Sequence, residues 1–222
     1  MIEKLLPTPI STAESFTDDP VEEMFPEEFA LVAGAVDKRQ REFGTVRNCA
    51  RRALATFGIA PAPVLPGPGR APRWPDGIVG TMTHCAGYRG AAVARATDLR
   101  SLGVDAEPHA PLDDPGVLSL VTLPEERAQL AQLAAHQPEI CWERLIFSAK
   151  ESVYKAWYPL TGRWLGFEEA RLTLDPTDAT FTAQLLVPGP VVDGHRLDTF
   201  NGRWLIGSGL VMTAVTVTPE RR

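Results

Sequence analysis

Apolar residues recur at two spacings along the chain, one typical of helices and one of strands. From about Pro26 to Phe57 the spacing is helical, with a break or bend near Gly44 and a natural stop at Gly58. Residues 1–20 show neither spacing, so they are predicted to be a loose lead-in. Strands are predicted at 78–83, 90–96 and 101–107, and the last two are expected to form a hairpin around Thr97 and Asp98.

The second part of the chain repeats the mixture of helix and strand. Residues 109–116 have linker composition, and helices are predicted from Pro124 to about His136 and from about Glu139 to Tyr158. Strands are predicted at 164–174, 180–187 and 203–217, and the last is rich in β-branched residues and expected to lie centrally in a sheet. The pattern therefore predicts an α+β protein with halves at 1–108 and 109–222, between which no sequence repeat is evident.

The composition is that of an ordinary globular protein. Hydrophobic residues are 44% and charged residues 23% of 222. No apolar window approaches the length of a membrane span, and the first residues do not resemble a secretory signal, so no membrane partner is expected. The cysteines, Cys49, Cys85 and Cys141, are too widely spaced for a disulfide framework or a zinc site. A cytoplasmic location is predicted.

The charge distribution argues against nucleic acid as the main partner. The net charge is −6, yet residues 38–52 contain six basic side chains against the single acid Glu42. Residues 14–28 contain seven acids and no base. A basic cluster in an acidic protein suits a small anion, although a solvated helix face would show the same charges.

The first candidate for chemistry is the segment from Gly103 to Pro108, GVDAEP. Side chains alternate along a strand, so Asp105 and Glu107 project to the same face. Such a pair of carboxylates suits Mg²⁺, which proteins usually bind with one or two carboxylates plus phosphate oxygens and water. A polar strand face at a solvent edge would also account for the pair.

The second candidate is the helix around Glu151. Its apolar stripe, from Trp142 to Trp157, predicts a core-facing side, and Glu151 lies opposite with Lys155 one turn further on. Phe147 and Tyr154 flank this carboxylate, which suggests a cleft rather than open solvent; an ordinary surface ion pair is the alternative. His84 ends a predicted strand, and neither a zinc motif nor a GxSxG motif occurs.

GVDAE followed by FSAKESVYKAW resembles the paired signatures of the 4′-phosphopantetheinyl transferase superfamily. The spacing is similar to that of the long, monomeric, surfactin-synthetase type. VRNCARRAL, VGTMTHCAGYRGAAVA and TGRWLGFEEA resemble its actinobacterial and enterobactin-synthetase-related branch. The resemblance covers about residues 38–175 and implies a pseudo-twofold pair of similar α/β halves with the active site in the cleft between them.

The resemblance also implies roles for individual residues. It assigns a metal site to Asp105, Glu107 and Glu151, with Ala106 contributing only its backbone. It places Thr83 and His84 beside the coenzyme A phosphates, and Tyr154 and Trp164 beside the pantetheine arm. The remaining matches are basic residues, namely Arg39, Arg47 and Arg70 for the nucleotide end, and Lys150 and Lys155, which with Glu151 form the implied catalytic set.

The implied reaction moves 4′-phosphopantetheine from coenzyme A to a serine of an acyl or peptidyl carrier protein. It would use Mg²⁺, with Mn²⁺ possible, and release adenosine 3′,5′-bisphosphate. The carrier could serve fatty-acid, polyketide or nonribosomal-peptide synthesis, and residues 117–130 are a candidate docking segment. Two rivals remain, a Mg²⁺-dependent nucleotide hydrolase and a non-catalytic adaptor for coenzyme A or a carrier.

Overall fold

A computed structural model describes residues 1–219, apart from the side chains of Glu22 and Pro115. Its α-helices are α1 (Pro26–Ala30), α2 (Asp37–Ala55), α3 (Pro115–Val121), α4 (Pro124–His136) and α5 (Trp142–Thr161). The strands are β1 (Ser11–Ser15), β2 (Ile78–Cys85), β3 (Tyr88–Arg95), β4 (Ser101–Pro108), β5 (Ala170–Asp175), β6 (Thr180–Leu185), β7 (Val191–Val192), β8 (His195–Arg196), β9 (Thr199–Gly207) and β10 (Leu210–Val217).

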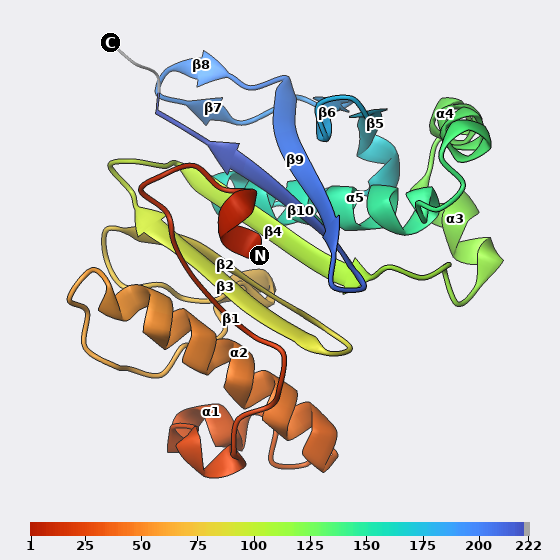
Figure 1. Cartoon of the computed structure of the whole chain (residues 1–222). Helices are drawn as coiled ribbons and strands as arrows, with labels where there is room; N and C mark the ends of the chain where they lie inside the picture. The colour runs from red at the N-terminus through yellow and green to blue at the C-terminus, as the bar shows by residue number, and fades with distance from the viewer. Residues whose placement is uncertain (220–222) are drawn as a thin grey trace.

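The first half is a three-stranded sheet covered by one long helix. The strand order is β1-β3-β2, and α2 lies across the outer face of this sheet (Figure 1). Ala91 and Val93 of β3 face α2, whereas Ala92 and Ala94 face the other way. Because β3 is buried on both faces, its sequence is almost continuously small and apolar.

The second half is a five-stranded sheet in the order β4-β10-β9-β6-β5, with α5 on one face. The predicted helix over 139–158 and the predicted central position of the last strand are both confirmed, since β10 lies between β4 and β9. The predicted strand 203–217 is wrong in extent, because Ser208 and Gly209 have positive φ and form a tight turn between β9 and β10.

Strand β4 connects the two halves. The predicted hairpin between 90–96 and 101–107 is wrong: β3 pairs with β1 and β2, while β4 pairs antiparallel with β10. The chain crosses from one sheet to the other between Arg95 and Ser101. The acids of β4 therefore lie in the second sheet but beside the first, and the boundary at residue 108 stays a prediction.

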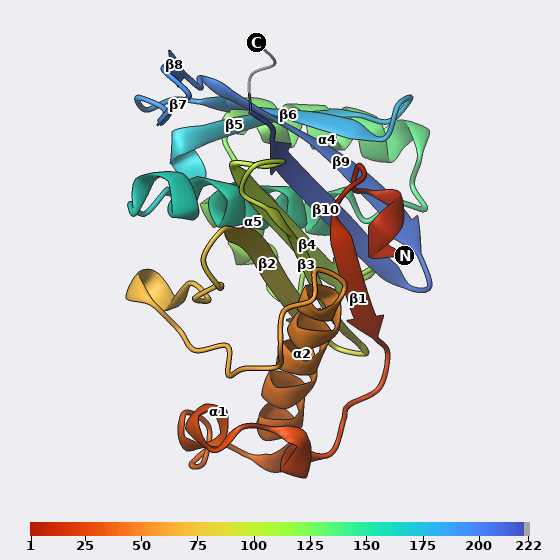
Figure 2. The ribbon, with the colours of Figure 1, turned by 90° about the vertical axis from the view of Figure 1, so that its left-hand side faces the viewer.

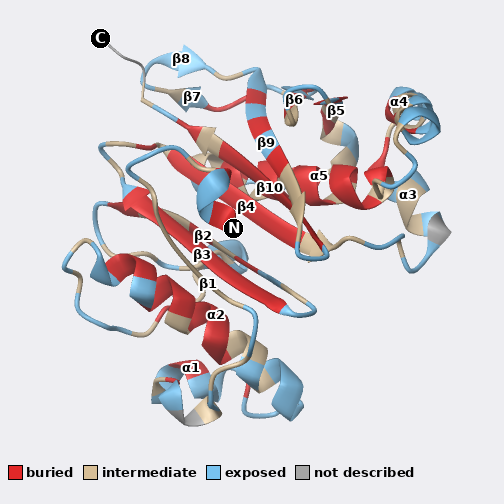
Figure 3. Ribbon diagram, in the orientation of Figure 1, coloured by how far each residue is buried: buried red, intermediate tan, exposed pale blue. Residues whose placement is uncertain are grey.

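Helix α2 packs on the first sheet, the first sheet packs on β4 and β10, and α5 packs on the other face of these strands, with β5 and β6 beyond it (Figure 2). A core between the two sheets contains Ile2, Leu5, Tyr88, Val104 and Met212, and a second core lies between the larger sheet and α5. Figure 3 shows the buried residues along β3, β4, β10 and α5, with exposed residues concentrated on α1 and α4. This stack supports the predicted α+β class with two α/β halves.

Three further predictions of local structure are corrected. Residues 1–20 are not a loose lead-in, because they contain β1 and the fully buried Ile2. The helical region 26–57 breaks at 31–36 rather than near Gly44, which lies inside α2 against the side chain of Met24. The predicted strand 164–174 begins only at Ala170, after a 3-10 turn over Phe167–Glu169.

Among the residues that the structure describes, no helix is long and apolar enough to cross a bilayer.

Candidate active site

The site is built on the edge of β4 that faces the first sheet. The N–H groups of Val104 and Ala106 point away from β10 and donate to the hydroxyls of Thr81 and Thr83 on β2, at 3.3 and 3.1 Å. Threonine hydroxyls thus satisfy an edge that has no backbone partner there. This fixes the junction between the halves, and it uses the backbone of Ala106, whose side chain lies in the core between the sheets.

Asp105 lies at the centre of the site. Its Oδ1 accepts hydrogen bonds from Lys155 Nζ at 2.7 Å and from Thr83 Oγ1 at 3.2 Å. Its Oδ2 is buried and accepts no hydrogen bond from any described residue. An unsatisfied buried carboxylate oxygen is costly, so its presence indicates a place where a ligand binds.

Lys155 does not form the surface ion pair with Glu151 that the sequence left open as an alternative. Its ammonium donates to Val104 O and Asp105 rather than pairing with Glu151 one turn away. The pairing is across the interface between α5 and β4, and within the described residues Glu151 has no ion-pair partner. Lys155 therefore joins the predicted helix and strand signatures physically.

The two glutamates of the site have raised pKa values. Burial and the charge of Asp105 raise the pKa of Glu107 to about 7, against the opposing effect of Arg144. Burial raises the pKa of Glu151, Lys155 opposes the rise, and Asp105 adds to it. A carboxylate with a raised pKa is costly to ionise in the free protein, and a cation bound beside it would stabilise its charged form. Once ionised, such a carboxylate is also a better proton acceptor than an ordinary one.

The donor set fits a hard divalent cation, although the described side chains do not form a complete cage. No group of three or more His, Cys, Asp or Glu residues within residues 1–219 is arranged to hold a metal ion. Asp105 and Glu107 nevertheless offer two carboxylates on one face, one with an unpartnered oxygen. Since Mg²⁺ commonly takes one or two carboxylates and fills its remaining positions with water and phosphate oxygens, these residues fit such an ion.

Arg144 is a member of the site that sequence reasoning missed. It is buried, donates to Glu107 Oε2 at 3.2 Å, and also donates to the carbonyl oxygens of Ala110 and Pro111. It therefore orients Glu107 and fixes the chain where it leaves β4. It lies in α5 only three residues before the FSAKESVYKAW signature, but outside the residues that carry the resemblance, and its contact with Glu107 on β4 depends on the fold.

Three basic side chains, Arg39, Arg47 and His84, lie close together in the first half, on α2 and β2. Arg39 Nη1 contacts His84 Nε2, and the two are next to the end of β2. Arg47 is buried: it stacks on Phe43, and its Nε donates to Val64 O at 3.0 Å. Burial, with some repulsion from Arg39, lowers the pKa of Arg47 to about 10 despite the nearby Glu28. These predicted anion-binding residues are therefore within electrostatic range of one another.

The pKa of His84 provides a test of this group of basic side chains. Burial and then the charge of Arg39 lower it to about 4, so the imidazole is neutral at pH 7. We expect Arg39→Gln to raise the pKa of His84 toward the ordinary 6.5, because one neighbouring positive charge is removed. A histidine NMR titration measures this, with Lys38→Gln as control. An unchanged pKa of His84 in Arg39→Gln would show that the charge of Arg39 does not contribute to lowering it.

An aromatic wall lies on the other side of Glu151. Tyr154 and Trp164 have ring centroids 4.8 Å apart, and Trp164 is 71% exposed. Together with Glu151 and Phe167 they line a small pocket. Another cavity, of about 700 Å³, lies between the N-terminal segment and strands β6, β9 and β10. None of the predicted site residues lines it, so the volume of a cavity does not identify the active site in this protein.

The loop of residues 59–77 approaches this wall from the first half. A Cβ atom at Gly69 would lie 2.2 Å from the hydroxyl oxygen of Tyr158, so the loop lies directly against α5. Arg70 follows with a φ of 64°, a conformation that side chains rarely adopt. The predicted base Arg70 therefore lies in a loop that bridges the two halves, while its contact with a ligand stays a prediction.

Lys150 is placed differently from what its predicted catalytic role suggests. Its ammonium forms a buried ion pair with Glu126 at 2.9 Å and donates to the carbonyl oxygens of Phe167 and Ala170. Burial lowers its pKa, and Glu126 opposes this. The contacts of the ammonium thus all lie inside the second half, and Lys150 lines the same pocket as Glu151, Phe167 and Ala170.

Comparisons with known proteins agree on one family. A family model described as the 4′-phosphopantetheinyl transferase N-terminal domain matches residues 27–94, and one described as the 4′-phosphopantetheinyl transferase superfamily matches residues 101–197. The chain is 62% identical to the 4′-phosphopantetheinyl transferase Svp of Streptomyces mobaraensis over 98% of this chain and 89% of that protein.

Two further relatives show the range of the similarity. The 4′-phosphopantetheinyl transferase PptT of Mycobacterium tuberculosis is 47% identical over 94% of this chain and 92% of its own. Enterobactin synthase component D of Salmonella typhi is 33% identical over 68% of this chain and 61% of its own. The resemblance inferred from the two sequence signatures is thereby confirmed.

Proposed function

Because the chain belongs to the 4′-phosphopantetheinyl transferase superfamily and is an enzyme of that kind, we propose that it moves 4′-phosphopantetheine from coenzyme A to a carrier-protein serine. Adenosine 3′,5′-bisphosphate is the second product. The observation that carries this proposal is the meeting of Asp105 on β4 with Lys155 on α5, beside an unpartnered carboxylate oxygen. A diphosphate bound with a cation at this point would satisfy that oxygen.

Coenzyme A binds across the junction of the halves in this proposal. Arg39, Arg47 and His84 hold the nucleotide phosphates, because positive and neutral donors on one surface fix an anion by charge-assisted hydrogen bonds. Thr83 keeps Asp105 in position. The pantetheine arm lies along Tyr154 and Trp164, whose rings are in contact at an interplanar angle of 53° and provide an apolar surface.

The chemical step is a displacement at the β-phosphorus of coenzyme A. The serine oxygen of the carrier forms a bond to this phosphorus, and the bond to the oxygen bridging the α-phosphate breaks, so the nucleotide leaves with that electron pair. Glu151 accepts the serine proton, a role favoured by its raised pKa. Lys155 offsets the negative charge that builds up in the transition state.

Asp105 and Glu107 would hold Mg²⁺, with the backbone of Ala106 between them. Within the described residues Glu151 is not grouped with these two acids, so the predicted third ligand is assigned here the role of base alone. When bound, such an ion neutralises and aligns the diphosphate. Lys155 occupies Oδ1 of Asp105, which leaves Oδ2 for the ion. Arg144 keeps one oxygen of Glu107 engaged and so presents the other.

Transfer to a carrier is tested by mass spectrometry. We expect an apo carrier protein incubated with this enzyme, coenzyme A and Mg²⁺ to gain the mass of one phosphopantetheine, and a carrier with its serine changed to alanine to gain nothing. A panel of fatty-acid, polyketide and nonribosomal-peptide carriers identifies the class served. Hydrolysis of coenzyme A without any modified carrier would instead favour the hydrolase reading. The monomeric state, the cytoplasmic location and docking at residues 117–130 stay predictions.

A further inference from the structure

A short sequence pattern occurs once in each half of the molecule. The letters FPEEFA at 25–30 and LPEERA at 123–128 share a proline, two glutamates and an alanine at equal spacing. In the structure each pattern begins a helix, α1 or α4, with the proline as its first residue. The sequence prediction that the halves contain no repeat is therefore corrected at this point.

The second glutamate of the first pattern is completely buried. Glu28 Oε2 accepts the N–H of Phe25 at 3.3 Å, closing the start of its own helix. Its Oε1 accepts from Arg51 Nη1 of α2 at 2.6 Å and from the backbone N–H of Val64 at 2.8 Å. Val64 is also buried and lies in the loop of residues 59–77, six residues before Arg70.

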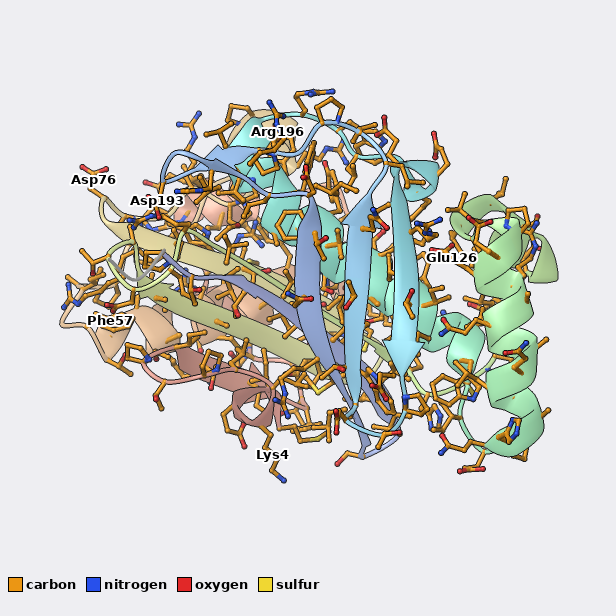
Figure 4. All side chains as sticks on the ribbon, turned by 90° about the horizontal axis from the view of Figure 1, so that it is seen from above. Lys4, Phe57, Asp76, Glu126, Asp193 and Arg196 are labelled. Atoms are coloured by element: carbon orange, nitrogen blue, oxygen red, sulfur yellow. The ribbon has the colours of Figure 1, made fainter. Side chains whose placement is uncertain are left out.

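The second glutamate of the other pattern makes the same set of contacts. Glu126 Oε2 accepts the N–H of Leu123 at 2.7 Å and pairs with Lys150 of α5 at 2.9 Å. Its Oε1 accepts the backbone N–H of Leu172 at 2.6 Å. Figure 4 labels Glu126 where α4 faces the larger sheet. Leu172 lies in β5, the edge strand of that sheet, and follows the segment that carries Trp164.

Each glutamate therefore joins three things: a helix start, a cation on the main helix of its half, and one distant backbone N–H. A buried carboxylate is costly unless it is paired and hydrogen-bonded, and here both are fully satisfied. Each carboxylate is paired with its cation and also accepts a backbone N–H, and charge-assisted hydrogen bonds are stronger than neutral ones. In the first half Arg47 also donates to Val64 O, so both backbone polar groups of Val64 are hydrogen-bonded to buried charged side chains.

We propose that Glu28 and Glu126 are equivalent positioning residues, each of which holds a segment next to residues that the proposed function assigns to coenzyme A. Glu28 holds Val64 in the loop that contains Arg70 and Arg73. Glu126 holds Leu172 directly, and through Lys150 it holds Phe167 and Ala170, in the segment that follows Trp164. The inference rests on the proposed function for the identity of the ligand. It assigns both residues an effect on coenzyme A binding, although neither touches the proposed reacting atoms.

The test compares each glutamate with the exposed glutamate beside it. Glu28→Gln and Glu126→Gln keep size but lose charge, while Glu27→Gln and Glu125→Gln make the same change at the surface. We expect the first two to raise the Kd and KM for coenzyme A about tenfold with kcat changed less than about twofold, in the range that supporting residues cost. The surface variants should bind like the unaltered enzyme.

A second readout is independent of activity. Hydrogen exchange should be faster at the Val64 amide in Glu28→Gln and at the Leu172 amide in Glu126→Gln, and not in the reverse combinations. If a single variant does not fold, the neutral pairs Glu28→Gln with Arg51→Met and Glu126→Gln with Lys150→Met replace it. Their readout is the exchange rate alone, and the same faster exchange is expected at Val64 or at Leu172.

The outcomes separate this inference from the proposed function. Folded Glu28→Gln and Glu126→Gln enzymes that match their surface controls in coenzyme A affinity would overturn the inference. A loss confined to kcat would also overturn it, because that would place the residues in the chemical step. If the unaltered enzyme does not bind coenzyme A, the proposed function is wrong. The exchange rates at the Val64 and Leu172 amides would still show whether Glu28 and Glu126 hold these two segments.

Discussion

Asp105→Asn is expected to lower kcat/KM for carrier modification by about a hundredfold to a thousandfold, the effect of removing one preorganised electrostatic group. Asparagine keeps the size of the side chain and can still accept the hydrogen bonds of Thr83 and Lys155 at one oxygen. It replaces the buried, unpartnered Oδ2 with a neutral group or an N–H donor. An anionic ligand bridged by a cation would then lose its central carboxylate contact.

The matched control is Asp76→Asn, which makes the same chemical change at an exposed position in the loop before β2. Its activity should equal that of the unaltered enzyme. Thermal unfolding of both variants checks that the fold survives, and calorimetric titration with Mg²⁺ in the presence of coenzyme A measures the loss of cation binding directly. Full transfer activity in a folded Asp105→Asn enzyme would mean that Asp105 does not hold the reacting complex.

Local patterns in the sequence predicted the parts of the site that are short-range. Strand alternation put Asp105 and Glu107 on one face, and helical spacing separated the buried stripe of α5 from Glu151. Both predictions concern residues close together in the sequence, whose relative directions are fixed by the period of the strand or helix that contains them. The family resemblance then joined the two signatures, and the contact between Lys155 and Asp105 agrees with that joining.

Pairings between distant segments could not be predicted in the same way. Two adjacent strands joined by a short turn suggested a hairpin, yet β4 pairs with β10 from the end of the chain. The free backbone N–H groups of β4 donate to threonine hydroxyls of β2 instead of to the backbone of a neighbouring strand. The spacing of apolar and polar residues in the sequence gives no sign of such side-chain contacts. Likewise, Lys150 resembles a catalytic lysine by position, and only the fold reveals its buried partner Glu126.

The two halves also interact through a close approach that sequence alone did not reveal. Ser101, Gly103 and Asp105 alternate along the face of β4 that meets α5. Ser101 Oγ donates to Ala156 O at 2.6 Å, so strand and helix backbones are nearly in contact at this end. The small residues draw α5 onto β4, and this brings Lys155 within 2.7 Å of Asp105. Gly103 therefore controls the geometry of the site through packing.

The largest effect on stability is expected for Gly103→Ala. A Cβ atom at this position would lie 2.0 Å from Ser152 O and 2.7 Å from Ala156 N, both backbone atoms of α5 that no side-chain rotation can move. Overpacking a core typically costs about 1–3 kcal/mol, and a collision with rigid backbone belongs at the upper end of that range. A loss of about 3 kcal/mol corresponds to a Tm lowered by about 10 °C in a chain of this size.

Gly34→Ala is the matched control for Gly103→Ala, because no atom lies within 4 Å of a Cβ added there and its backbone is not strained. Its Tm should stay within about 2 °C of the unaltered enzyme, as surface substitutions usually do. Differential scanning calorimetry of the three proteins measures the difference. If Gly103→Ala has the same Tm as Gly34→Ala, α5 does not pack against β4 as closely as the structure shows. If it melts early but folds at low temperature, its transfer rate should also fall, since α5 must move away from β4 and carry Lys155 away from Asp105.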